Sequence, residues 1–369
     1  MSENINELKS DSYIRRDATG IIKGVALVFM FIHHFFTLPE YYTVDTPFPF
    51  SEKFAEIFKE PFKICVPVFA FLTGVFYVYV KKKNLRYSLK KASDLWLKYL
   101  FFFLLMLIPA IALKCWDFSA KALLLELTCL GNSIVTFNWY VIFYIIAILL
   151  MPLYHLLAKR HLLLAVITGI MIPIALDAVV ESFTISQPEL YKVATNCLNW
   201  FPCIASGYIF AEHRVFERMF DPLFKNNIKP KALRGLIYFS VMAVAFMGRY
   251  FAPGVNFNVS VLTVDIPFDY LYAPLFVYGL VNIIYGFPWK KLWIPIGVIG
   301  KYSLGLWLVH RVFFNSCREY TLPILLLPKN PVLVLLWGLA ICFAVTFVMM
   351  ILIRPLLRLK NKWLFPEKP

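Results

Sequence analysis

The sequence predicts an all-α integral membrane protein, and three observations support this class. Of the 369 residues, 60% are hydrophobic and only 16% are charged, and the mean hydropathy is +0.69. The apolar residues form continuous runs of the length that a spanning helix needs, about 17–25 residues. The runs do not alternate apolar with polar residues, which excludes a transmembrane β-barrel.

We predict about ten transmembrane helices. The apolar runs lie at residues 21–38, 62–80, 95–114, 138–157, 162–180, 196–212, 233–251, 267–286, 292–314 and 332–353. With loops assigned to alternate sides, 27 of the 37 Lys and Arg residues share a side with both termini. Because cytoplasmic loops carry the excess of Lys and Arg, both termini are predicted to be cytoplasmic and the protein to be a multi-pass protein of the inner (cytoplasmic) membrane.

The chain is predicted to hold one membrane domain, residues 15–355. A flexible polar N-terminus, 1–14, precedes it, and a short basic cytoplasmic tail, 356–369, follows. The first apolar run has no small-residue cleavage site after it, so we interpret it as a retained span and not a signal peptide. No appended soluble domain is expected.

The net charge of +15 is interpreted as a topology signal and not as a nucleic-acid interface. The basic segments 81–91 and 213–234 fit cytoplasmic loops beside the anionic lipids of the bilayer. A basic cytoplasmic face would also attract a polyanionic cofactor. The seven cysteines include no CxxC pair and no His/Cys cluster at metal spacing, so neither a metal site nor a disulfide is predicted.

Three ionisable residues stand out in the first run: Lys23, His33 and His34. Lys23 and His34 are eleven residues apart, which places them on one helix face and about 16 Å apart along the axis. A lysine at the cytoplasmic mouth could hold the phosphates of an acyl-CoA. The imidazole of His34, at the far end of the thioester arm, could then act as a general base.

Structural interpretations compete with these roles. A lysine that flanks a span commonly reaches out to the headgroups. An intramembrane histidine often makes a hydrogen bond between helices. Since neighbours on a helix point about 100° apart, only one of the two histidines can share the face of Lys23.

Four stretches, in order, resemble the membrane-bound acyltransferase 3 family. Lys23-x10-His34 fits its hallmark of Arg or Lys, ten residues and His. The stretch 67-PVFAFLTGVF-76 resembles its second-span segment, with Thr73 where Ser is usual. Two later stretches, 138-NWYVIFY-144 and 300-GKYSLGLWLVHR-311, resemble further spans of the family, the second with Trp307 in place of Tyr.

The resemblance implies transfer of an acyl group, most commonly acetyl, from cytoplasmic acyl-CoA (acetyl-CoA) to a hydroxyl of a cell-surface glycan or of its lipid-linked saccharide precursor. It implies that His34 is the catalytic base and Lys23 a donor-side cation. The family often has an arginine pair after the second span. This chain has four other cations there, which we take as the candidate CoA ligands: Arg86, Lys90, Lys91 and Lys98.

His310 is a second intramembrane histidine and a further catalytic candidate, together with His33. Ser303 lies seven residues before His310 and shares its helix face. A structural hydrogen bond would explain His310 equally well. Arg311, next to it, is expected to point outward to the headgroups.

Polar and aromatic residues at the outer ends of the runs are candidates for binding the saccharide acceptor. Apolar ring faces beside carboxylates and amides suit a sugar, although aromatic belts occur at every membrane interface. The candidates are Trp139, Tyr140, Trp200, Arg249 and Asp269. The segment 40–61 either covers the acceptor site or is a plain connector.

Two other functions compete with acyl transfer. A proton-coupled transporter of a polar solute would use His34 and His310 as relay members. The sequence shows no inverted repeat and no matched pair of broken spans to support it. A catalytically inactive, flippase-like partner in glycan export would keep the fold and tolerate loss of His34. Consumption of radiolabelled acyl-CoA in detergent separates the acyltransferase from the transporter.

Overall fold

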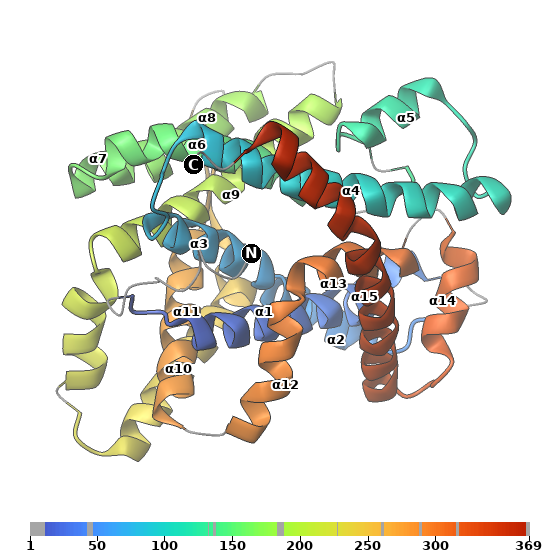
Figure 1. Ribbon diagram of the computed structural model, residues 1–369. Coiled ribbons are helices and arrows are strands. Elements are labelled where there is room, and N and C mark those ends of the chain that lie inside the picture. Colours follow the sequence, from blue (N-terminus) through green and yellow to red (C-terminus); the bar gives the residue numbers. More distant parts are fainter. Residues whose placement is uncertain are drawn as a thin grey trace.

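The computed structural model describes residues 12–42, 47–131, 133–135, 138–182, 188–226, 228–259, 262–287, 290–314 and 317–366. These residues form a bundle of helices with one short β-hairpin (Figure 1). The helices are α1 (Arg16–Phe36), α2 (Glu52–Phe62), α3 (Cys65–Val78), α4 (Leu85–Ala112), α5 (Ala120–Leu127), α6 (Trp139–Ala158), α7 (Leu162–Val166), α8 (Ile172–Ser182), α9 (Pro188–Glu212), α10 (Lys231–Phe251), α11 (Asp269–Gly286), α12 (Lys290–Lys301), α13 (Ser303–Val309), α14 (Arg318–Leu326) and α15 (Pro331–Leu364).

Shorter elements join the helices. Two 3₁₀ turns, η1 (Pro39–Tyr41) and η5 (His310–Phe313), follow α1 and α13, and three π-helical turns are η2 (Ile167–Met171), η3 (Phe216–Phe220) and η4 (Pro222–Asn226). The antiparallel strands β1 (Gly254–Val259) and β2 (Leu262–Pro267) form the hairpin between α10 and α11. This hairpin is an exception to the all-α prediction. Its β-branched residues, Val, Thr and Ile, favour strands.

Seven helices among the described residues are long and apolar enough to cross a membrane, and the number rises to eight if α12 and α13–η5, bent by 63°, form one broken span. The protein is therefore a multi-pass helical membrane protein. The ten predicted runs are all helical, but two of them, in α9 and α11, are absent from these candidates. Both helices pack against other helices, α9 against α3, α6 and α8, and α11 against α10, α9 and α3. A helix that faces protein needs less apolar surface than one that faces lipid.

Both ends of the described chain contact the helix bundle. Residues 1–11 of the predicted flexible terminus lie outside the described residues, but Ile14 is buried and Tyr13 donates a hydrogen bond to Asp221 (2.8 Å). The predicted tail is also helical, because α15 continues to Leu364. In Figure 1 this red helix bends towards α4, and it carries Pro355 in its C-terminal part.

Glycines allow α1 to lie against α12. A Cβ at Gly24 would overlap the carbonyl oxygen of Ile296, and a Cβ at Gly300 would overlap that of Gly20. Gly20 and Gly24 form a GxxxG pattern, which is typical of helices that pack closely in membranes. The same device joins α3 to α9, where Gly74 and Gly207 meet backbone atoms of the other helix.

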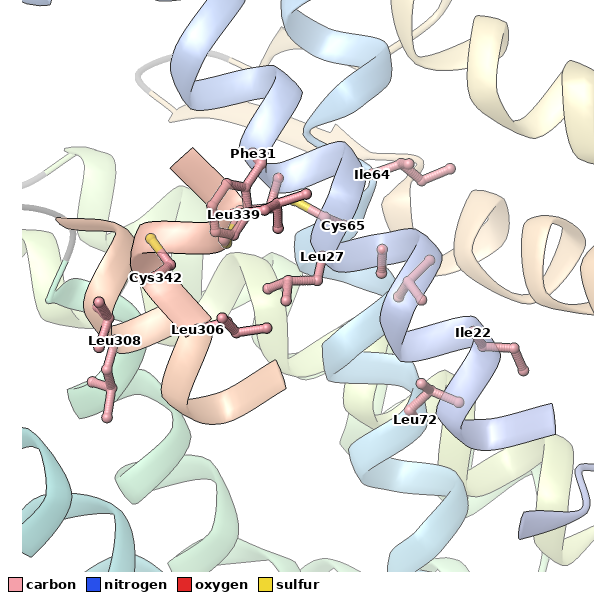
Figure 2. Close-up of a cluster of buried hydrophobic side chains, with 14 of the residues drawn as sticks. Ile22, Leu27, Phe31, Ile64, Cys65, Leu72, Leu306, Leu308, Leu339 and Cys342 are labelled. Carbon is pink, nitrogen blue, oxygen red and sulfur yellow. The ribbon is translucent and has the colours of Figure 1, made fainter. Parts of the chain in front are cut away.

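The main hydrophobic core surrounds α1 and joins it to α3, α13 and α15 (Figure 2). Leu27 and Phe31 of α1 are fully buried in this core, as are Leu306 of α13 and Cys342 of α15. Lys23 and His34 lie near the same side of α1 as Leu27, which is four residues after Lys23 and seven before His34. The core and the glycine contacts together therefore fix both the position and the rotation of the helix that bears these two residues.

We predict that Gly300→Ala destabilises the protein by about 1–3 kcal/mol, because the added methyl group overlaps the backbone of α1. The measurement is the thermal unfolding midpoint of the purified protein in detergent. Gly286→Ala is the control, since a Cβ at this last residue of α11 meets no atom within 4 Å. Equal midpoints for the two variants would contradict the close contact of α1 with α12.

Candidate functional site

A cavity of about 640 Å³ lies between α1, α3, α4, α6 and α13. Lys23 and His34 both line it, as their placement on one helix face predicts. Since α1 is a regular helix, the two residues are separated by about 16 Å along its axis. The cavity therefore has a lysine end, which we define by Lys23, Lys91, Asp94 and Lys98, and a histidine end, which we define by His33 and His34.

Three lysines meet at the lysine end. Lys91 and Lys98 of α4 line the cavity together with Lys23, whose ammonium group lies 5.3 Å from the centre of the Phe76 ring. The other two predicted CoA ligands are placed elsewhere. Arg86 donates a hydrogen bond to the carbonyl oxygen of Pro366 (2.7 Å), and Lys90 is not among the residues that line the cavity.

Asp94 is a residue of the lysine end that the sequence analysis missed. It lies three residues after Lys91 and four before Lys98, so the three side chains share one face of α4. The signal is present in the sequence as a carboxylate spaced i+3 and i−4 from two lysines of one helix.

His34 and His310 form a hydrogen-bonded pair at the histidine end. Nδ1 of His34 lies 2.8 Å from Nε2 of His310, and the two rings are within 3° of parallel. Nδ1 of His310 lies 2.6 Å from the carbonyl oxygen of Trp307. His310 is fully buried and does not line the cavity, so it lies behind His34 as seen from the cavity.

These contacts assign the protons of the neutral pair. A carbonyl oxygen only accepts, so Nδ1 of His310 carries the proton of that ring and Nε2 is its acceptor. Nδ1 of His34 therefore donates to His310. The basic lone pair of the neutral His34 ring is consequently on Nε2, the nitrogen that a general base would use.

His33 has a different environment from its neighbour. Its Nδ1 lies 2.9 Å from the hydroxyl oxygen of Thr37, and that hydroxyl donates to the carbonyl oxygen of His33 (2.7 Å). The hydroxyl proton is thus engaged with the backbone, and Nδ1 of His33 is the donor to Thr37. His33 also lines the cavity, but its ring is bound within α1 and the turn that follows it.

The prediction that Arg311 points outward to the headgroups is wrong. It is fully buried, and its guanidinium carbon lies 4.2 Å from the centre of the Trp307 ring. None of its three guanidinium nitrogens has a hydrogen-bond partner in the described part of the chain. His310 and Phe313 of the same turn, η5, are also buried, so protein encloses the Arg311 side chain.

Aromatic residues line the cavity beside the histidine end. Trp139 and Tyr140, both predicted acceptor ligands, belong to the lining, and Tyr140 packs edge-on against Trp307 (5.4 Å between ring centres). Trp200 does not line the cavity. Its ring stacks on that of Trp139 with the centres 6.0 Å apart, so it supports the residue that does.

The segment 40–61 contributes to the cavity, although residues 43–46 lie outside the described residues. Glu40 and Tyr41 line the cavity, as does Lys63 just beyond the segment. Burial, with the charge of Glu40 beside it, raises the pKa of Tyr41, so its hydroxyl remains protonated at neutral pH. The segment is therefore a wall of the cavity and more than a connector.

Arg249 and Asp269, the remaining predicted acceptor ligands, bind each other. Arg249 donates to the two carboxylate oxygens of Asp269 at 2.6 and 3.2 Å and also binds the backbone carbonyl of Glu60. Both side chains are buried, and neither lines the cavity. The bidentate pair joins α10 to α11 and to the end of α2.

Residues 19–354 match the family model described as an acyltransferase domain. No curated protein and no solved structure matches the chain. The match covers α1 through most of α15 and includes every residue of the cavity. The chain therefore belongs to the acyltransferase 3 family and is a membrane acyltransferase.

Proposed function

We propose that the protein is an O-acyltransferase that uses acyl-CoA, most simply acetyl-CoA, as its donor. The donor enters the cavity at the lysine end, and the acceptor is a hydroxyl of a cell-surface glycan or of a lipid-linked saccharide at the histidine end. The reaction requires no metal ion. The observation that carries the proposal is one cavity with cations at one end and a histidine pair at the other.

The dimensions of the cavity suit this donor. Ammonium groups hold phosphate oxygens as point charges, and three of them line the lysine end. The apolar side chains between the ends, such as Met30, Leu72 and Phe76, suit an extended uncharged arm. A separation of about 16 Å between Lys23 and His34 places the thioester beside the imidazole when the phosphates are at the lysines.

Nε2 of His34 takes the proton of the acceptor hydroxyl as its oxygen attacks the thioester carbonyl. When the tetrahedral intermediate collapses, the carbon–sulfur bond breaks and His34 returns the proton to the sulfur, which gives the ester and the free thiol. The imidazolium formed in between remains hydrogen-bonded to His310, whose own N–H is fixed by the Trp307 carbonyl. These two hydrogen bonds orient His34 and stabilise its charged form, much as a carboxylate does in a catalytic triad.

For the acceptor, Trp139 and Tyr140 offer ring faces at the histidine end, and Glu40 and Lys63 offer polar groups. This combination suits a saccharide, which presents C–H groups on its ring faces and hydroxyls at its edges. We further propose that α9 and α11 also cross the membrane, which gives ten spans. Both termini and the lysine end then lie in the cytoplasm, and the protein resides in the inner membrane.

His34→Ala is expected to lower acyl transfer at least about 100-fold, because a positioned general base contributes about 10²–10⁴-fold. The first assay measures the transfer of label from [¹⁴C]acetyl-CoA to surface glycan in membranes. The second measures the ester content of the glycan in cells that express the wild-type protein or the variant at the same level. Full complementation by His34→Ala would show that the histidine is structural.

His155→Ala is the matched control, because it also removes a histidine with a hydrogen bond, here to Tyr208 (2.6 Å), but one that does not line the cavity. It should retain near wild-type transfer. Should wild-type protein in detergent consume no labelled donor, transport by way of His34 and His310 becomes the better explanation.

Lys23→Met keeps the length of the side chain and removes its charge. We expect the KM for acyl-CoA to rise about tenfold with little change in kcat, because an interaction made equally in the ground and transition states affects KM alone. Lys23→Arg, which restores the charge, should recover most of the loss. An unchanged KM in the methionine variant would mean that Lys23 serves only to anchor α1 at the membrane surface.

A further inference from the structure

The C-terminal part of α15 returns to the lysine end of the cavity. It lies beyond Pro355, and its contacts are with α4, the helix that carries Lys91, Asp94 and Lys98. Figure 1 shows it crossing towards α4 from the vertical part of the helix. In the sequence this segment is part of the predicted short basic cytoplasmic tail, 356–369.

Lys360 is the residue that makes this contact. Its ammonium group forms an ion pair with Asp94 and donates a hydrogen bond to the hydroxyl of Ser93 (3.0 Å). The side chains are well shielded, with 10% of Lys360 and 13% of Asp94 exposed. A second contact holds the segment, since Arg86 donates to the carbonyl oxygen of Pro366 (2.7 Å).

Asp94 lies between Lys360 and the cavity. Asp94 lines the cavity and Lys360 does not, so the carboxylate separates this lysine from the space that Lys23, Lys91 and Lys98 face. Three lysines of the cavity lining and Lys360 thus lie at or beside the lysine end, which holds one carboxylate. Such an excess of positive charge is unfavourable unless an anion joins it, and the negative charge of Asp94 compensates only one of the four cations.

We propose that Lys360 binds the phosphates of the nucleotide part of the donor, and that Asp94 occupies the position of this anion until the donor arrives. The inference rests on the proposed function and adds a residue from outside the cavity to its donor site. When the phosphates enter, Lys360 exchanges its carboxylate partner for a phosphate oxygen. A lysine suits such an exchange because its ammonium group is a point charge on a flexible stem.

The two partners of the ion pair should then have opposite effects on donor affinity. Lys360→Met removes a phosphate ligand, and we expect the Kd for CoA to rise about tenfold. Asp94→Asn removes a like charge that repels the phosphates and competes for Lys360, so the Kd should fall about threefold or more. If the ion pair only fastened α15 to α4, both substitutions would break the same link and change the Kd in the same direction.

The experiment measures CoA binding to the purified full-length protein by isothermal titration calorimetry, with the thermal midpoint of each variant recorded without ligand. Both variants should show a similarly lowered midpoint, because each breaks the ion pair, while their Kd values move apart. Lys362→Met is the matched control: this exposed lysine lies on the same helical segment, and its loss should change neither quantity.

Several outcomes would overturn the inference. If CoA bound more weakly to both variants, or equally well to both and to the wild type, the ion pair would be only a structural link, and the proposed function would still stand. A fall in affinity with Lys362→Met as large as with Lys360→Met would show a general effect of surface charge. Failure of wild-type protein to bind CoA would instead overturn the proposed donor, and the inference with it.

Discussion

The arrangement of the site depends on how α1 is held against the broken helix α12–α13. Glycines bring the backbones of α1 and α12 together, and the His34–His310 hydrogen bond joins α1 to the end of α13. Because α12 and α13 are bent by 63° relative to each other, one part of the broken helix supports each end of the cavity-lining face. The glycine contacts with α1 thus lie before the break, and the His34–His310 contact lies after it.

Two sets of ionisable side chains among the described residues differ in what they contact. Arg249 and Asp269 satisfy each other, and such a pair contributes to the register of the helices it joins. His34 and the three lysines of the lysine end instead line a cavity, with His310 hydrogen-bonded behind His34. Ionisable residues are costly inside a membrane, so those that line a cavity are the ones for which a chemical role is the natural explanation.

Features that depend on residues close together in the sequence could be predicted from it. The helical period alone placed Lys23 and His34 on one face, and the structure confirms that both line one cavity. The resemblance to the acyltransferase 3 family, based on four short stretches, is confirmed by a match over residues 19–354. The span count was less secure, because helices enclosed by protein, such as α9, need not be strongly apolar.

Other features could not be predicted because they depend on partners distant in the sequence. Arg249 and Asp269 were expected to bind the acceptor, but polarity at the end of a span does not tell whether a residue meets a ligand or another residue. The burial of Arg311 and the contact of α15 with α4 both depend on tertiary packing. The sequence holds no local signal for either.

The stiffness of α1 has a consequence for the kind of ligand that the cavity suits. Eleven residues of regular helix hold Lys23 and His34 about 16 Å apart, so a ligand that reaches both must be long enough to bridge that distance. The lining beside His34 comes from other parts of the chain and includes Glu40 and Tyr41 of η1 and Lys63. If the proposed function holds, α1 sets the length of the donor's arm, whereas η1 and Lys63 set the room for the groups that meet at its end. Substitutions in η1 would then change which groups fit there without changing the length of arm that is recognised.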